Sequence, residues 1–537
     1  MKVAVSNALS ISADAVLDAL REATRFSVQA VKLGAVCILL GSCTSSTIGR
    51  DVLRVGIVSL PPAYGNPYAA MGAPASVTWQ QLFDGLTRID EAGNIVGALA
   101  TDWYLIDPHT WHFKLRRGVQ FSNGSPFDAE IAKEVFDWLL GDAGRFTPVG
   151  NELRDLAEVS VLDSHELLIR TRLPDPILPN RLAMVMMVEP NEWRNLGPKA
   201  FGQMPVGTGP YVLRTWRNKN GAAELLANGN GWRRPHVNVV ELYPLLDHAA
   251  RFQAAISNQL HLAQSMKPEE MEIFRKRGFD VLVDPSKQII GIAFDVVGHP
   301  ESPISDRRVR QAINYAVDRH SISKIITYGI HKPASQGAAP GVFGYNPDLE
   351  PYPFDPAKAR ELLREAGYAN GFSIKATIVQ GTYANDTEIY QKVQEDLADV
   401  GIEITLVATL FSDWIRQYVT GEWRTEAFSL GWNTAPYHDA IRPMDYFSCG
   451  KARPFFCDQS MMAEIENAAT EIRSTEREQA LQKLQIRFHD EAPSLFLLEY
   501  GHIWVASNKV SGFEMANGAP QLYKLRYSQA TDRKVNR

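Results

Sequence analysis

Strand-like and helix-like segments alternate along this chain, and this alternation restricts its possible folds more than any other feature. Residues 53–60 alternate apolar and polar side chains as a strand does, whereas residues 79–86 have the spacing of an amphipathic helix. The pattern predicts an α/β architecture. Further strands are expected at residues 111–115, 159–172, 237–243 and 374–379, and further helices at residues 127–140, 309–317, 356–366, 388–400 and 461–471.

The composition is that of a globular protein with a large core. Of the 537 residues, 45% are hydrophobic and 22% are charged, so the fold does not depend on disulfides. The net charge is −6, and the sequence contains no run of five or more Lys and Arg residues. A surface that follows the phosphates of a nucleic acid is therefore not expected.

The N-terminal residues have the layout of an export signal. The apolar run 33–40 is too short to span a bilayer as a helix, and three basic residues precede it. We therefore expect residues 1–42 to be a signal peptide. It ends in Leu40-Gly41-Ser42-Cys43, which resembles a bacterial lipobox, so Cys43 is expected to carry a lipid that holds the protein to the membrane. An ordinary cleaved signal and a buried apolar helix are the alternatives.

The remaining cysteines fit an exported protein. Cys37 lies in the apolar leader, which leaves Cys449 and Cys457, eight positions apart across a segment that contains proline. In an oxidising compartment this pair is expected to form a disulfide, with two free thiols as the alternative. A metal site is disfavoured because the intervening segment has no histidine and no third cysteine.

Motifs of common enzymes are missing from the sequence. It contains no G-x-S-x-G, no H-E-x-x-H and no phosphate-binding G-x-x-x-x-G-K-[ST] run. Residues 321–324 fit S-x-x-K, but the S-D-N and K-T-G partners are absent. His109 and His112 are three apart near a predicted strand, where that spacing points to opposite faces. We expect no catalytic residue, metal or cofactor, with a secreted hydrolase as the remaining enzyme alternative.

Seven short runs occur in a fixed order across roughly residues 52–510. The runs are Leu82–Asp90, Leu99–Trp103, Trp111–Phe127, Gly207–Tyr211, Val309–Arg319, Asp355–Leu363 and Ala366–Tyr368. Together they resemble the dipeptide/oligopeptide-binding family (family 5, cluster C) of ABC-importer solute receptors. Most of these residues have structural interpretations: Asn123-Gly124 suits a turn, and Asp128 and Asp355 suit helix N-caps.

The resemblance implies a two-lobed periplasmic-binding-protein fold of the type II, or venus-flytrap, α/β class, with an extra α/β domain on the first lobe. The solute would be enclosed between the lobes when they close. The implied boundaries are residues 51–92, 206–297 and 500–530 for lobe I, residues 93–205 for the extra domain, and residues 298–499 for lobe II.

The resemblance also implies a function. The chain would be the extracytoplasmic solute-binding subunit of an ABC importer, a monomer on the periplasmic or cell-surface side of the cytoplasmic membrane. It would capture a small organic solute, such as a peptide-like compound, an opine or a sugar, and deliver it to permease subunits. A protein that presents its ligand to a signalling receptor is the alternative.

One motif departs from the family pattern at the expected ligand site. Trp432 matches a tryptophan that commonly lines the pocket, although a core tryptophan is the alternative. Peptide-binding members usually place an aspartate three residues later, where it pairs with the α-amino group of the ligand. Here that residue is Ala435. Either Asp439 replaces the aspartate, or the ligand has no free α-amino group, which is the reading we favour.

Arg442 is the other charged candidate in this region. Its guanidinium could bind a carboxylate or phosphate through two hydrogen bonds, with a surface salt bridge as the alternative. The remaining ligand-binding candidates lie in the same loop or directly after predicted strands. They are Asn433, Thr434, Tyr437, His438, Tyr64, Asn66, Tyr383, Asn385, Phe411 and Trp414.

Overall fold

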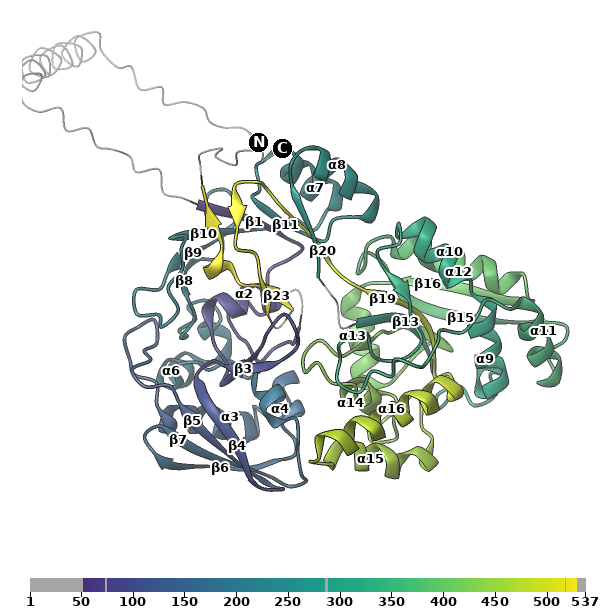
Figure 1. The fold of residues 1–537 in the computed structure, drawn as a ribbon, viewed down its shortest axis with the longest axis horizontal. Helices are drawn as coiled ribbons and strands as arrows, with labels where there is room; N and C mark the ends of the chain where they lie inside the picture. The colour runs from purple at the N-terminus through teal and green to yellow at the C-terminus, as the bar shows by residue number, and fades with distance from the viewer. Residues whose placement is uncertain (1–51, 73–74, 285–287, 517, 529–537) are drawn as a thin grey trace, which may run out of the picture. The chain divides into compact units, whose positions relative to one another are not determined.

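The computed structural model describes residues 52–528 apart from residues 73–74, 285–287 and 517. In this range the chain forms two seven-stranded sheets and a smaller four-stranded sheet, each covered by helices (Figure 1). The predicted signal peptide, residues 1–42, and the predicted lipid-bearing Cys43 lie outside the described residues.

The first sheet is built around β1, whose residues Leu53, Val55 and Ile57 are fully buried. This strand pairs in parallel with β10 and β11, as expected when helices connect the strands. The strands, in spatial order, are β12 (Asp280–Val283), β20 (Ile503–Ala506), β11 (Leu262–Gln264), β1 (Val52–Ile57), β10 (Val239–Pro244), β9 (Ala223–Ala227) and β8 (Tyr211–Thr215).

The second sheet is built around β13, which is buried over six of its seven residues. Strand β18 (Trp432–Asn433) pairs with β13 beside the main path of the sheet. The other strands, in spatial order around β13, are β14 (Lys332–Pro333), β19 (Ser494–Tyr500), β13 (Gln288–Phe294), β17 (Ala427–Ser429), β15 (Phe372–Val379) and β16 (Ile402–Thr409).

One domain boundary differs from the sequence-based expectation. Residues 288–297 were expected in lobe I, but β13 pairs with β17, β18 and β19 and therefore belongs to the second sheet. The chain crosses from one sheet to the other twice, from β12 to β13 and from β19 to β20. These two crossing segments are hydrogen-bonded to each other, because the amide of Asp284 donates to the carbonyl of His502 over 2.8 Å.

The third sheet is antiparallel throughout. The single strand expected at residues 159–172 is two strands, because the turn at Ser164–His165 reverses the chain between them. The strands, in spatial order, are β4 (Ala100–Asp107), β5 (Thr110–Leu115), β7 (Glu166–Thr171) and β6 (Leu156–Asp163). A short hairpin of β2 (Thr87–Ile89) and β3 (Ile95–Gly97) precedes this sheet. The outer boundaries of the extra domain stay a prediction.

Several helices begin at the N-caps that the sequence predicts. The Asp128 carboxylate accepts from the Ile131 amide, and the Asp355 carboxylate accepts from the Lys358 amide. The helices over the first and third sheets are α2 (Ala75–Leu82), α3 (Ala129–Leu140), α4 (Pro148–Glu152), α5 (Leu178–Leu182), α6 (Pro190–Phe201), α7 (His248–Ile256) and α8 (Met271–Lys276). Those that follow β13 are α9 (Arg307–Ala316), α10 (Arg319–Ser321), α11 (Pro356–Glu365), α12 (Asp386–Ala398), α13 (Phe411–Thr420), α14 (Ile441–Tyr446), α15 (Met462–Thr470) and α16 (Ser474–Glu491).

The ordered sequence motifs do structural work. The buried Arg310 guanidinium donates to the Glu491 carbonyl, and Asp318 caps α10 by accepting from the Ser321 amide. Gly209 lies so close to the backbone of Leu82 that a Cβ would clash there. These residues therefore stabilise the fold.

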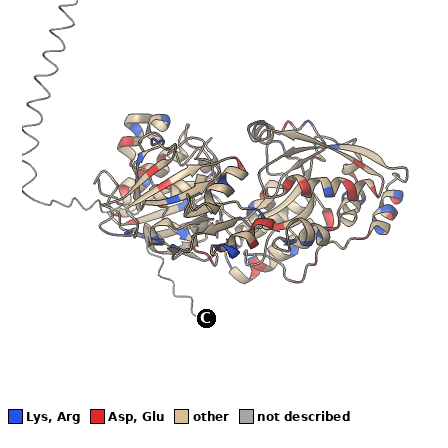
Figure 2. Ribbon diagram, turned by 90° about the horizontal axis from the view of Figure 1, so that it is seen from above, with Lys and Arg blue, Asp and Glu red and all other residues tan. Residues whose placement is uncertain are grey.

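Charged residues of both signs are interspersed over the described chain instead of gathering by sign (Figure 2). Within the residues that the structure describes, no helix is both long and apolar enough to cross a membrane.

Candidate ligand-binding site

A tight loop carries the chain from β18 to α14. The Asn433 side chain accepts from the Ala435 amide, and the Thr434 carbonyl accepts from the His438 amide over 2.7 Å. His438 adopts a positive φ of 51°, which reverses the chain. This loop buries Tyr437 and leads directly to Arg442 on α14.

Arg442 is a buried cation with an incomplete set of partners. Its side chain is 9% exposed. Nη1 donates to the Asn433 carbonyl over 2.9 Å, and Nη2 lies 3.2 Å from Oε1 of Glu152. Among the described residues, none accepts a hydrogen bond from Nε. The guanidinium packs over the rings of Tyr437 and Tyr446, at 5.4 and 4.9 Å from their centroids.

Glu152 reaches Arg442 from α4, which follows α3 over the third sheet. Its carboxylate also lies 3.8 Å from Arg181 and accepts from the Tyr446 hydroxyl over 3.3 Å. Burial acts to raise the pKa of Glu152, but the charges of Arg442 and Arg181 outweigh burial and hold the pKa below its usual value. Glu152 is therefore an ionised carboxylate that joins elements about 290 residues apart in the chain.

A second cation lies beside Arg442 among the same aromatic rings. The Lys451 ammonium sits 4.6 Å from the ring centroid of Tyr418 and 4.3 Å from that of Tyr446. Burial lowers the pKa of Lys451 to about 8, although Asp445 and Glu152 act to raise it. The group that we call the Arg442 cluster consists of Glu152, Arg181, Tyr418, Tyr437, Arg442, Tyr446 and Lys451.

The Arg442 cluster contains only two of the predicted ligand-binding residues, Tyr437 and Arg442. Two more, Phe411 and Trp414, continue its line of rings along α13, because Trp414 stacks nearly parallel on Tyr418 and Phe411 stacks nearly parallel on Trp414. Sequence reasoning missed the five other members. A partial signal exists in the spacing of four between the members on α14, which places both on one face of that helix. The sequence offers no signal for the contact with Glu152.

Trp432 occupies a core position in the structure. The residue is fully buried, its indole stacks on Phe447 with ring centroids 4.0 Å apart, and its N–H donates to the Ser494 hydroxyl over 2.8 Å. These contacts engage both the flat face and the polar atom that a ligand would use. A direct contact between Trp432 and the ligand stays a prediction.

Asp439 is engaged by a cation from the protein itself. Its two carboxylate oxygens accept from Nη1 and Nη2 of Arg477 over 2.7 and 2.8 Å, and one of them also accepts from the Ile441 amide. Both side chains are buried. Of the two explanations for Ala435, replacement of the missing aspartate by Asp439 is therefore disfavoured.

The remaining candidates lie at several places in the fold. His438 lies against Gly93 of the β2–β3 hairpin. The exposed Tyr64 contacts Trp216, and Asn66 caps a turn by accepting from the amide of residue 68. Tyr383 and Asn385 follow the C-terminal end of β15. The Tyr383 hydroxyl accepts from Gln288, and the side-chain amide of Asn385 donates to Glu269.

The predicted disulfide between Cys449 and Cys457 is present in the structure. Lys451 lies inside the loop that this bond closes and donates to the Tyr418 hydroxyl, so the loop restricts the position of this cation within the Arg442 cluster. The described residues include no group of three or more His, Cys, Asp and Glu side chains that could hold a metal ion. His112 instead pairs with Glu166 over 2.8 Å.

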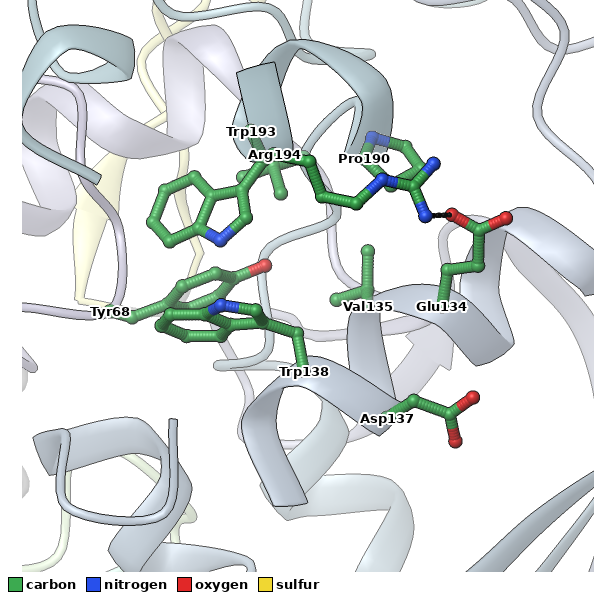
Figure 3. A pocket seen from close by; sticks show the side chains of 9 residues that line it. Tyr68, Glu134, Val135, Asp137, Trp138, Pro190, Trp193 and Arg194 are labelled. Atoms are coloured by element: carbon green, nitrogen blue, oxygen red, sulfur yellow. Dashed lines mark ion pairs between the residues drawn. The ribbon is translucent and has the colours of Figure 1, made fainter. Parts of the chain in front are cut away.

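A separate cavity of about 250 Å³ lies between α3 and α6. Figure 3 shows the rings of Tyr68, Trp138 and Trp193 gathered on one side of it, with the ion pair of Glu134 and Arg194 on the other. These rings contact one another, with centroids 4.8 to 5.4 Å apart. None of the predicted ligand-binding residues lines this cavity.

Comparison with known sequences identifies a family. The profile described as "Bacterial extracellular solute-binding proteins, family 5 Middle" matches residues 94–453. The chain is similar to the glutathione-binding protein GsiB of Escherichia coli (strain K12), with 28% identity over 388 residues that cover 70% of this chain and 73% of the relative. The GsiB of Pectobacterium atrosepticum is 26% identical over 470 residues, covering 83% and 88%.

Solved structures show the same fold. The periplasmic binding protein DppA from Helicobacter pylori in complex with the peptide STSA has a TM-score of 0.77 at 20% identity, covering 89% of this chain and 98% of that one. The binding protein AgaA from A. tumefaciens R10 in complex with agropinic acid has a TM-score of 0.76 at 19% identity, covering 89% and 99%. The predicted fold class, a two-lobed α/β binding protein, is therefore confirmed.

Proposed function

The chain belongs to the bacterial extracellular solute-binding proteins of family 5, and from this premise we propose that it captures a small, carboxylate-bearing, peptide-like solute for an ABC importer. The two large sheets would form the cores of the two lobes. The two crossing segments that are hydrogen-bonded through Asp284 and His502 would act as the hinge. The protein binds and releases its solute without making or breaking a covalent bond.

The observation that carries this proposal is the incomplete hydrogen bonding of Arg442. A buried guanidinium with an N–H that lacks an acceptor is costly, and a carboxylate is the group that matches its planar fork. The aromatic rings around Arg442 supply flat apolar walls for the body of an organic solute. Relatives named for glutathione binding and neighbours solved with a peptide or agropinic acid support this solute class.

The missing aspartate limits which peptide-like solutes fit. Ala435 offers no charge to an α-amino group, and Asp439 is committed to Arg477. Recognition therefore rests on the carboxylate of the solute. Acetylation of its amino group should change the affinity by less than about twofold, because no buried carboxylate is left unpaired by that change.

A thermal-shift screen of the purified full chain tests the proposal. Peptides, glutathione, opines, sugars, phosphodiesters and metal chelates are compared, because a solute that binds only the folded protein raises its melting temperature. We expect carboxylate-bearing solutes to give the largest shifts and their amides to give small ones. Sugars or phosphodiesters as the only stabilising classes would contradict the proposed solute.

Arg442→Lys is the matched variant for this screen. It keeps the charge but loses the planar fork, so binding of carboxylates should weaken about 10- to 100-fold. Arg453→Lys is the control, because Arg453 lies in the loop that the disulfide closes, outside the Arg442 cluster, with a side chain that is 61% exposed. Unchanged affinity in Arg442→Lys would place the carboxylate elsewhere.

Anchoring to the membrane through Cys43 is part of the proposal and rests on the lipobox-like sequence alone. Cells that express the chain are labelled with a radioactive fatty acid, and the label should be lost in Cys43→Ala. Label that persists in this variant would show that the anchor is wrong.

A further inference from the structure

The contact between Glu152 and Arg442 uses only part of the guanidinium. Arginine presents a two-donor edge formed by Nε and Nη2, which fits both oxygens of one carboxylate. Glu152 takes only Nη2, with Oε1 3.2 Å away, and leaves Nε without an acceptor among the described residues. Glu152 is therefore an incomplete partner for this edge.

Other partners can hold the Glu152 carboxylate if it leaves Arg442. Its second oxygen, Oε2, lies 3.8 Å from Arg181, and the Tyr446 hydroxyl donates to Oε1. Moving away from Arg442 would therefore not leave a buried carboxylate without a cation, which is the change that costs several kcal/mol in protein interiors.

Arg442 itself is held in place independently of Glu152. Its Nη1 donates to the Asn433 carbonyl, and two tyrosine rings pack on its faces. The Nε/Nη2 edge thus keeps its direction whichever carboxylate is present. A carboxylate that spans both donors gains a charge-assisted hydrogen bond that Glu152 does not make.

We propose that Glu152 is a built-in competitor that occupies Arg442 in the empty protein and is displaced when the carboxylate of the solute binds across Nε and Nη2. This inference rests on the proposed function, because it assumes that the solute carries a carboxylate. Glu152 lowers the affinity for every acid. It also favours acids that present both oxygens to the edge over neutral solutes that cannot displace it.

Titration calorimetry of the full chain tests this proposal with two acids and their amides: glutathione and its diamide, in which both carboxyl groups are amidated, and Ala-Ala-Ala and its C-terminal amide. In Glu152→Gln the competing charge is gone but the shape is retained. We expect the acids to bind about tenfold more tightly than to the wild type, while the affinities of the amides change less than twofold. Glu152→Asp, shorter by one methylene, should also bind the acids more tightly.

Glu158→Gln is the matched control, because Glu158 pairs with Arg170 on the exposed face of the third sheet. It should leave all four affinities unchanged. If Glu152 only links α4 to α14, Glu152→Gln weakens the binding of acids and amides alike, and the proposal is overturned. Equal binding of the acids by wild type and Glu152→Gln overturns it as well, while the proposed function stands. If neither protein binds any acid, both the inference and the proposed solute class are wrong.

Discussion

Neutralising Asp439 should destabilise the protein strongly while leaving its solute specificity intact. The side chains of Asp439 and Arg477 are 2% and 4% exposed and share two hydrogen bonds of 2.7 and 2.8 Å. Asp439→Asn preserves the shape of the side chain and its bond to the Ile441 amide. It leaves the Arg477 charge buried without a counter-ion, which costs about 3–5 kcal/mol of unfolding free energy.

Urea unfolding followed by far-ultraviolet circular dichroism measures this loss. With a slope of about 3 kcal/mol/M, the midpoint should fall by roughly 1 M. Glu361→Gln is the control, because the pair of Lys358 and Glu361 is 41% and 47% exposed, and the loss of a solvent-screened pair should leave the unfolding midpoint almost unchanged. The double change of Asp439→Asn with Arg477→Gln should cost less than the sum of the single changes, because it leaves no unpaired charge. An Asp439→Asn protein that is as stable as the wild type but binds solute poorly would refute this reasoning and return Asp439 to the ligand site.

Three further predictions concern stability. Burial raises the pKa of Glu499 from 4.5 to about 7, so this carboxyl binds a proton more readily in the folded protein than in the unfolded chain. The stability that the protonated Glu499 contributes is complete below pH 4.5 and is lost as the pH rises through about 7. Glu499→Gln should therefore reduce the pH dependence of the melting temperature between pH 4.5 and about 8. Trp432→Ala should lower the unfolding free energy by about 3–5 kcal/mol in urea, because it removes a buried stack, and a fully stable variant would contradict the core placement. Cys449→Ser with Cys457→Ser should cost about 2–3 kcal/mol and abolish the sensitivity of the melting temperature to dithiothreitol, whereas retained sensitivity would show that the disulfide does not stabilise the chain.

The local elements were predictable because the interactions that form them are local. Helix α11 begins at the Asp355 cap that the sequence indicates, and β5 matches its predicted bounds to within one residue. The exception at residues 159–172 has a local cause too: Ser164 and His165 do not form a strong turn signal, so the two strands read as one.

The site was harder to predict because its contacts join distant parts of the chain. Arg442 and Tyr437 could be selected from their loop, but nothing near Glu152 in the sequence indicates that it pairs with a residue 290 positions away. Asp439 shows the same limit, because the local sequence does not distinguish an aspartate that binds a ligand from an aspartate in a buried ion pair. The sheet to which β13 belongs could not be predicted for a similar reason. Strand pairing depends on partner strands that are distant in the chain, and the sequence of β13 does not indicate them.

The central claim is that this protein binds a carboxylate solute and returns it unchanged. The most direct test incubates the full chain with an equimolar amount of the acid that gives the largest thermal shift. Unbound solute is removed by dialysis. The protein is then denatured, and the solute that it retained is identified by mass spectrometry. The account predicts that one solute is retained per chain and recovered with its original mass. A solute that is not retained, or one that is recovered as a product of different mass, would contradict it.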